Sequence, residues 1–161
     1  MTPPTPVDPI VERSDEGRAL QFSLSERLVW KARAQTTGGV LDQFELTADP
    51  GHAGAPEPVH YAVDEFLYVL EGAFRFKVRD ELLVAPAGTF LFVARETRHT
   101  WTNAAQTRSR MLLTYVPGGM QPLFEEASPY MHADEVDMAG LGRVNERYRT
   151  EVVGPSLAPG R

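Results

Sequence analysis

Residues 57–72 read EPVHYAVDEFLYVLEG, and the interpretation of the whole chain depends on this stretch. His60 precedes Glu65, and the apolar run that follows ends in Glu71 and Gly72. A bend over the intervening YAVD would turn both polar side chains toward one interior. Histidine is the commonest metal ligand and the natural acid or base near neutral pH. The stretch therefore predicts either a metal site or the edge of a buried strand.

A second stretch, residues 88–103, reads GTFLFVARETRHTWTN and places polar groups at the start of a strand. His99, Trp101 and Asn103 occupy alternate positions, so they share one face of an extended chain. We expect Trp101, Asn103 and Phe92 to line a substrate pocket beside His99. A place in the apolar core is the alternative for the two aromatic residues, and a turn-forming role is the alternative for Asn103.

Short runs rich in aromatic and β-branched residues dominate the middle of the chain. They are ALQFSL, LVWKARAQ, VLDQFELTA, EFLYVL, AFRFKVR, TFLFVA, HTWTN and RMLLTYV. Turns that contain glycine or proline separate most of them. Within the last run, Met111, Leu113 and Tyr115 alternate and share one face. Strands at this spacing, without helices between them, predict an all-β antiparallel sandwich or barrel.

The two ends of the chain differ in character from its middle. The predicted organisation is a flexible arm over residues 1–18, a β-barrel over residues 19–118, a helical segment over residues 119–153 and a tail over residues 154–161. The helical segment has acidic residues early and arginines late, which suits a helix dipole. Gly140 and Gly142 weaken this helix prediction. We expect the helices to pack against the outside of the barrel.

Composition limits the classes of partner. The formal net charge is −6, which argues against nucleic acid or an anionic membrane. The chain has no cysteine, so a thiolate ligand or nucleophile is excluded. Its first residues have neither the cationic start nor the apolar core of a secretory signal. No apolar run approaches the roughly 20 residues of a membrane helix. We expect a cytoplasmic protein that acts on a small molecule.

Together the two stretches resemble the paired motifs of the cupin superfamily. The first motif has, in outline, a His-x-His pair, a glutamate a few residues later and a Tyr-Val-Leu-x-Gly strand end. His60, Glu65 and the sequence YVLEG fall at these places. The second motif has a glycine turn, an apolar strand, a histidine and an asparagine, which Gly88, His99 and Asn103 match.

This resemblance covers about residues 37–117 and is closest to small single-barrel cupins often called quercetinase-like. It implies a double-stranded β-helix, the jelly-roll barrel, with a pocket inside it. Small cupins commonly form dimers by exchanging N-terminal strands, so the resemblance also implies a homodimer.

The resemblance further implies that His60, Glu65 and His99 hold a divalent transition metal. Two histidines and one carboxylate are the ligand set of the facial triad that holds non-haem iron and leaves coordination positions open. On ligand type alone, iron, manganese, nickel, cobalt or zinc could be bound.

One departure from the motif bears on this metal. The family's first histidine should lie two residues before His60, where this chain has Pro58. A site without metal, in which the three polar groups form a hydrogen-bonded cluster, is therefore the alternative. Glu57 and His52 are weaker candidates for an additional ligand, since Glu57 has the opposite strand parity to His60 and His52 lies in a turn-forming loop.

Three functions are compatible with these residues. The first is a quercetinase-like dioxygenase that acts on an aromatic or polyketide-like molecule, with a metal as Lewis acid and with Glu65 and His60 as catalytic residues. The second is a metal-free cyclase or isomerase in which His60 or His99 is the general acid or base and Glu65 orients it. The third is a non-catalytic barrel that binds a small molecule.

Overall fold

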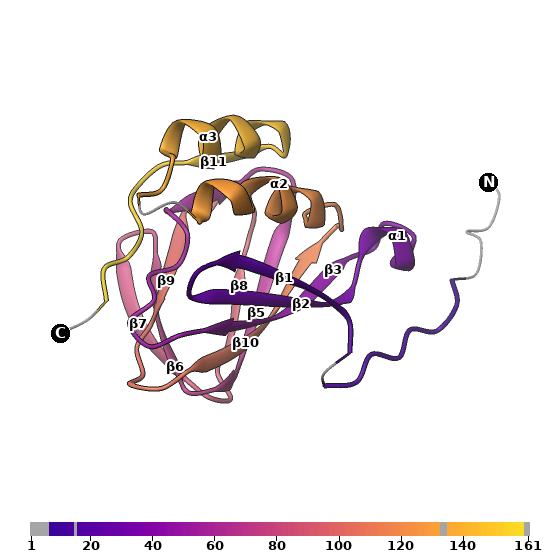
Figure 1. Cartoon of the computed structure of the whole chain (residues 1–161), viewed down its shortest axis with the longest axis horizontal. Helices are drawn as coiled ribbons and strands as arrows, with labels where there is room; N and C mark the ends of the chain where they lie inside the picture. Colours follow the sequence, from indigo (N-terminus) through magenta and orange to yellow (C-terminus); the bar gives the residue numbers. More distant parts are fainter. Residues whose placement is uncertain (1–6, 15, 133–134, 160–161) are drawn as a thin grey trace.

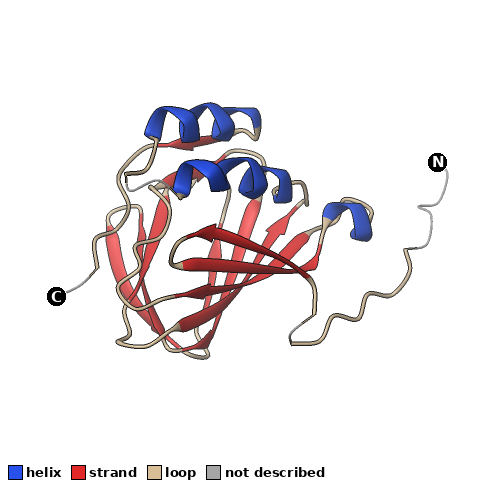
Figure 2. Cartoon of the chain, viewed as in Figure 1, coloured by secondary structure: helices blue, strands red, loops and turns tan. Residues whose placement is uncertain are grey.

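The computed structural model describes residues 7–14, 16–132 and 135–159 of the chain. In chain order, the elements are β1 (Arg18–Ser23), β2 (Glu26–Ala32), α1 (Ala34–Thr37), β3 (Asp42–Ala48), β4 (Pro58–His60), β5 (Asp64–Glu71), β6 (Ala73–Val78), β7 (Glu81–Pro86), β8 (Phe90–Val93), β9 (His99–Asn103), β10 (Ser109–Val116), α2 (Gln121–Met131), α3 (Met138–Arg147) and β11 (Thr150–Val152). Strands predominate, as the aromatic and β-branched runs predicted (Figure 2).

The strands form a jelly-roll barrel, and this confirms the predicted fold class. One sheet has six strands in the order β1-β2-β3-β10-β5-β8, and another has three in the order β7-β6-β9. β4 and β11 form a short additional pair. The strand pairs are antiparallel, and the two larger sheets enclose the core between them (Figure 1).

The alternation of side chains along β10 shows how the core is built. Met111, Leu113 and Tyr115 are buried, whereas the residues between them are half-buried on the other face. β10 lies between β3 and β5, and its register places Tyr115 opposite Glu65. The inward face of the central strand therefore carries a phenol directly beside a carboxylate.

The N-terminal segment contacts the barrel before β1 begins. Residues 7–14 form no helix or strand, and Lys31 Nζ donates hydrogen bonds to the carbonyl oxygens of Arg13 and Glu16 at 2.7 and 2.8 Å. β1 pairs with β2 of the same chain. Residues 1–6 and 15 lie outside the described residues, so mobility of the arm stays a prediction.

The C-terminal segment closes one end of the barrel, which corrects the expectation that its helices pack against the outside. α2 and α3 lie across this end (Figure 1), and both contribute residues to the internal cavity. The last part of the segment is not helical, because β11 pairs with β4 and places Thr150 opposite His60. None of the described helices has the length and apolar character that crossing a bilayer requires.

A buried carboxylate on β3 fixes the start of α2. Asp42 is fully buried, and its Oδ2 accepts hydrogen bonds from the backbone N–H groups of Gly119, Met120 and Gln121 at 2.7, 2.6 and 3.1 Å. The first N–H groups of a helix lack partners within the helix and attract negative charge. Asp42 supplies both the acceptor and the charge, so it holds α2 over the barrel.

Candidate functional site

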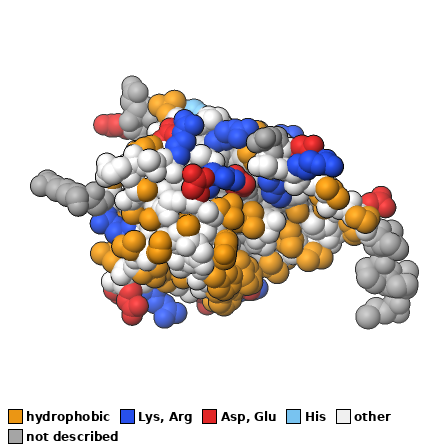
Figure 3. Space-filling view, turned by 90° about the horizontal axis from the view of Figure 1, so that it is seen from below, with side chains coloured by type: hydrophobic (Ala, Val, Ile, Leu, Met, Phe, Trp, Pro, Cys, Tyr) orange, Lys and Arg blue, Asp and Glu red, His pale blue; other side chains and the backbone are white. Residues whose placement is uncertain are grey.

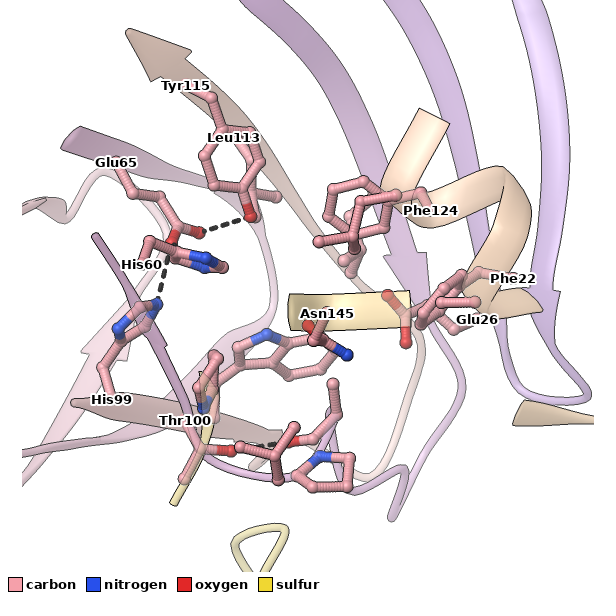
Figure 4. A pocket seen from close by; sticks show the side chains of 18 of the residues that line it. Phe22, Glu26, His60, Glu65, His99, Thr100, Leu113, Tyr115, Phe124 and Asn145 are labelled. Atoms are coloured by element: carbon pink, nitrogen blue, oxygen red, sulfur yellow. Dashed lines mark hydrogen bonds and ion pairs between the residues drawn. The ribbon is translucent and has the colours of Figure 1, made fainter. Parts of the chain in front are cut away.

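A cavity of about 70 Å³ lies inside the barrel, and residues of α2 and α3 form part of its wall. Figure 4 shows side chains that line it. Its walls are mostly apolar, and the residues that line it are Phe22, Glu26, Phe44, Leu46, Ala55, Pro56, Pro58, His60, Glu65, His99, Thr100, Trp101, Leu113, Tyr115, Leu123, Phe124, Ala127, Leu141, Asn145 and Val152. A pocket inside the barrel was predicted, and the structure confirms it.

The three predicted metal ligands meet at the wall of this cavity. β4 ends at His60, the chain bends, and β5 then carries Glu65 back toward the same interior, while β9 begins at His99. His99 Nε2 lies 2.7 Å from Glu65 Oε2, and His60 Nε2 lies 3.6 Å from the same oxygen. One ligand atom from each residue falls within 4.8 Å of the others, and all three residues are buried.

The outer nitrogen of each imidazole ring has its own partner. His60 Nδ1 lies 2.9 Å from Thr150 Oγ1 of β11, and His99 Nδ1 lies 3.0 Å from the carbonyl oxygen of Thr97. A carbonyl oxygen only accepts, so His99 Nδ1 carries a proton. In metal sites, such partners fix the ring orientation and direct Nε2 toward the ion. Both rings are held in this manner.

The site carries one proton between Glu65 and His99. Burial disfavours the charged form of both groups. The attraction and the hydrogen bond between Glu65 and His99 outweigh this effect of burial. The pKa of Glu65 is therefore held below its usual value, and the pKa of His99 is raised above its own. Burial lowers the pKa of His60 to about 4, so His60 is neutral at pH 7.

Tyr115 is a site residue that the sequence analysis did not identify. Its hydroxyl donates a 3.1 Å hydrogen bond to Glu65 Oε1, opposite the oxygen that faces the two histidines (Figure 4). Burial, and then the neighbouring Glu65 carboxylate, raise the pKa of Tyr115 well above its ordinary value. The phenol therefore stays a donor. The sequence feature that could have identified Tyr115 is its place in the alternation of β10, on the same face as Met111 and Leu113. A tyrosine hydroxyl that is buried on such a face needs a hydrogen-bond partner.

Of the three predicted pocket residues, only Trp101 lines the cavity. Asn103 is buried away from the cavity. Its Nδ2 donates to the carbonyl oxygens of Ala48, Asp49 and Thr107, so it links the end of β3 to the loop before β10. Phe92 is 50% exposed and does not line the cavity.

The prediction for Phe92 is corrected by the strand parity of β8. Leu91 and Val93 face the interior, and Phe92 packs on the outer face against Phe66, with 5.0 Å between the ring centroids. Both faces of β8 are apolar, so the sequence pattern did not distinguish the inner face from the outer one.

The candidates for an additional ligand lie elsewhere. Pro58 lines the cavity at the position of the missing histidine and presents an apolar ring there. The buried Glu57 carboxylate pairs with Lys77 Nζ at 3.2 Å and does not line the cavity. His52 Nε2 lies 3.0 Å from Glu26 Oε2, away from the cluster of His60.

The residues present fit a divalent transition metal. The donor set has two imidazoles and one carboxylate, and the Nε2 atoms turn toward Glu65 Oε2. The Nδ1 atom of each ring has its own hydrogen-bond partner, which fixes the ring orientation. A metal at this place would take the position of the proton that Glu65 and His99 share, because a ligating imidazole nitrogen must be free of its proton. His60, Glu65 and His99 would hold it.

A jelly-roll barrel with histidine and glutamate ligands on its inner wall defines a class of β-barrel proteins, and comparison with known proteins identifies the class. Residues 44–115 match the cupin domain family. The chain therefore carries a cupin domain over these residues. A search of curated proteins gave no significant match.

Solved structures of cupins resemble the chain in fold. KdgF from Halomonas sp. has 18% sequence identity and a TM-score of 0.59, with 67% of this chain and 93% of that chain covered. A predicted oxalate decarboxylase from Thermotoga maritima has 17% identity and a TM-score of 0.62, with 67% and 99% covered. A cupin sugar phosphate isomerase from Silicibacter pomeroyi has 16% identity and a TM-score of 0.51, with 57% and 59% covered. At these identities the likeness establishes the fold.

Proposed function

We propose that this cupin is a metal-dependent enzyme, and that its reaction is a dioxygenation of the quercetinase-like kind. The observation that carries the proposal is the convergence of His60 Nε2, Glu65 Oε2 and His99 Nε2 at the wall of the barrel cavity. Three protein ligands leave coordination positions open for a substrate. A bound redox-active cation would supply Lewis-acid activation of a substrate oxygen and the electron exchange that reaction with O₂ requires.

The cavity indicates the chemical class of the substrate. Apolar side chains cover most of its wall, and the polar cluster occupies one part of it. A molecule with an apolar body and one acidic hydroxyl or enol fits this division. A volume of about 70 Å³ is about half that of a cavity of roughly 150 Å³ that holds benzene, so α2 and α3 have to shift even for a single aromatic ring. A three-ring flavonol exceeds this space, so α2 and α3 would have to move outward for a substrate of that size.

The residues of the cluster have separate roles in this proposal. Tyr115 holds Glu65 through Oε1 and leaves Oε2 directed at the cavity. Glu65 stays ionised and offers Oε2 to the metal, and His60, neutral at pH 7, offers a free Nε2. Trp101 and the apolar wall exclude water and orient the body of the substrate.

A second candidate is a metal-free isomerase or cyclase. The hydrogen bond of 2.7 Å between Glu65 and His99 favours it, because this pair satisfies both groups without an ion. Pro58 at the position of the missing histidine favours it as well. In that case the Glu65–His99 pair would act as general acid and base on a proton next to a carbonyl.

Elemental analysis separates the two candidates. Untagged protein is analysed by inductively coupled plasma mass spectrometry beside His99→Ala and a control, His132→Ala, which removes an exposed histidine far from the cluster in sequence. We expect about one transition metal per chain in the unaltered protein and in the control, and loss of the metal in His99→Ala.

Oxygen uptake with small phenols and enols then tests the dioxygenation. Uptake that depends on the metal supports it. Absence of metal, even after reconstitution with iron, manganese, nickel, cobalt and zinc in turn, would refute the metal-dependent proposal. The metal-free candidate would then be tested by exchange of substrate protons with deuterated water.

A further inference from the structure

The cavity has a second polar end, formed by Glu26, that the proposed chemistry does not use. Glu26 begins β2 and is 3% exposed, yet it lines the cavity. Figure 4 shows its carboxylate and the side-chain amide of Asn145 on the other side of the cavity from Glu65 and His99. Burial of a carboxylate is costly unless something compensates it.

One oxygen of Glu26 is compensated by a neighbouring loop. His52 Nε2 lies 3.0 Å from Glu26 Oε2, and the imidazole ring packs edge to face against Trp101, with 5.7 Å between centroids. This pair holds the carboxylate in a fixed orientation. Oε1 has no hydrogen-bond partner among the described residues and remains as an acceptor.

Asn145 adds a second acceptor at the same end. It lies on α3, is 5% exposed and lines the cavity. Its Nδ2 donates to the carbonyl oxygen of Leu141 at 2.7 Å, which fixes the amide, and its Oδ1 has no partner among the described residues. Two oriented oxygens thus meet a cavity whose remaining wall is mostly apolar.

We infer that the cavity recognises a ligand with two polar ends, whose far end carries a hydrogen-bond donor, a hydroxyl or an amino group, bound by Glu26 and Asn145. This inference rests on the proposed function for the near end, where an acidic oxygen meets His60, Glu65 and His99. The apolar body of the ligand lies between Phe44, Leu113 and Phe124. A carboxylate that has lost water gains more from such a donor than from a methyl group, which would leave it unsatisfied.

Matched pairs of small probes test the far end. Each of the three dihydroxybenzenes is compared with the methylphenol of the same substitution pattern, so that a hydroxyl replaces a methyl of similar size. Binding is measured by isothermal titration calorimetry to protein of known metal content. We expect at least one dihydroxybenzene to bind tenfold or more tightly than its methylphenol. The corresponding aminophenol shows whether a hydroxyl or an amine is preferred.

Variants at Glu26 assign the preference. Glu26→Leu removes the acceptor, and Glu26→Gln keeps the shape without the charge. Glu45→Leu and Glu45→Gln are the controls, because Glu45 lies on the outer face of β3 and pairs with Arg110. We expect the hydroxyl preference to disappear in Glu26→Leu, to weaken in Glu26→Gln and to persist in both controls.

Two results would overturn the inference. The first is a hydroxyl preference that is unchanged in both Glu26 variants, and the second is binding of neither member of any pair. Metal content is expected to be unchanged in the Glu26 variants. Failure at the far end is therefore distinguishable from failure of the metal-dependent function, which the His99→Ala analysis tests separately.

Discussion

Tyr115 shows how a single inward hydroxyl sets the chemistry of a neighbouring carboxylate. Burial disfavours ionisation of Glu65, and the hydrogen bond from Tyr115 is one of the interactions that keep its pKa low nonetheless. A carboxylate must be ionised to bind a metal. The phenol therefore extends the pH range over which the site is ready to bind.

The variant Tyr115→Phe tests this role. Without the donor, the pKa of Glu65 rises, so protonation begins at a higher pH and competes with the metal there. We expect metal affinity to fall by roughly tenfold, and we expect the loss to be larger at pH 5 than at pH 8. Affinity is measured by competition with a chelator across this range. Profiles that stay parallel to those of the unaltered protein would contradict the role, since a general loss of packing would lower affinity equally at each pH.

Two of the side chains that act on the site illustrate what a sequence reveals at this scale. The alternation of the sequence placed Tyr115 on one face with Met111 and Leu113, and its register with Glu65 followed only from the folded sheet. Thr150, in contrast, lies 90 residues from His60 and gives no local signal. His60, Glu65 and His99 were predictable because the motif fixes their spacing, whereas their supporting partners come from distant segments.

At the scale of elements, β11 connects the C-terminal segment to the metal site. Its pairing with β4 brings Thr150 Oγ1 to within 2.9 Å of His60 Nδ1. Loss of such a supporting bond commonly costs 10- to 100-fold in metal affinity. We expect Thr150→Val, which keeps the shape of the side chain, to lower metal affinity by about this factor.

The measurement for Thr150→Val is the same chelator competition, beside Thr114→Val as control. Thr114 is half-buried on the outer face of β10, and its hydroxyl accepts a hydrogen bond from Gln43 on that face. Circular dichroism verifies that both variants fold. Equal affinity in Thr150→Val and Thr114→Val would show that β11 holds the segment in place without acting on His60.

The contact between α2 and α3 depends on a glycine that weakened the helix prediction. A methyl group at Gly140 would lie 2.3 Å from the ring of Tyr130 on α2, whereas one at Gly142 would meet nothing within 4 Å. We expect Gly140→Ala to lower the free energy of unfolding by about 1–3 kcal/mol through overpacking. Gly142→Ala should leave it unchanged or raise it by up to about 1 kcal/mol.

Urea unfolding of the two glycine variants checks this pair of expectations. The comparison is internally controlled, because both substitutions remove a glycine from the same helix. Similar effects of the two would mean that Tyr130 moves aside without cost. Because α3 carries Asn145 and Leu141 to the cavity, a real clash should also weaken binding of the small phenols.

The position of these helices could not be predicted from the sequence, although their existence was. A stripe of apolar residues indicates which face of a helix is buried, but it does not indicate the surface that buries it. Here the decisive partner is Asp42, on a strand almost 80 residues earlier, which binds the first N–H groups of α2. The helices therefore complete the cavity instead of covering the outside of the barrel.

At the scale of the whole molecule, the outer face of β5 and β8 is unusually apolar. Tyr68, Leu70, Phe90 and Phe92 are 43%, 38%, 58% and 50% exposed. Figure 3 shows hydrophobic side chains gathered on one side of the molecule. The sequence placed aromatic residues in β8 correctly within a strand but could not assign their face, because Leu91 and Val93 are apolar as well. Large exposed apolar patches mark surfaces that associate.

We propose that this face joins two copies of the chain, as the expected homodimer requires. A two-fold interface uses the same patch on both copies, so one apolar surface is sufficient. β1 pairs with β2 of its own chain, and we propose the apolar β5–β8 face as the contact between copies. Light scattering coupled to gel filtration should give twice the mass of the 17.9 kDa chain.

A charge placed at the centre of this face tests the assembly. We expect Phe92→Glu to give the mass of a single chain, because a dimer would then bury two unpaired carboxylates. Leu24→Glu is the matched control, since Leu24 is 71% exposed in the turn between β1 and β2, and it should remain dimeric. A single-chain mass for the unaltered protein at high micromolar concentration would refute the dimer. A dimer that persists in Phe92→Glu would place the interface elsewhere, with exchange of the N-terminal strand as the next candidate.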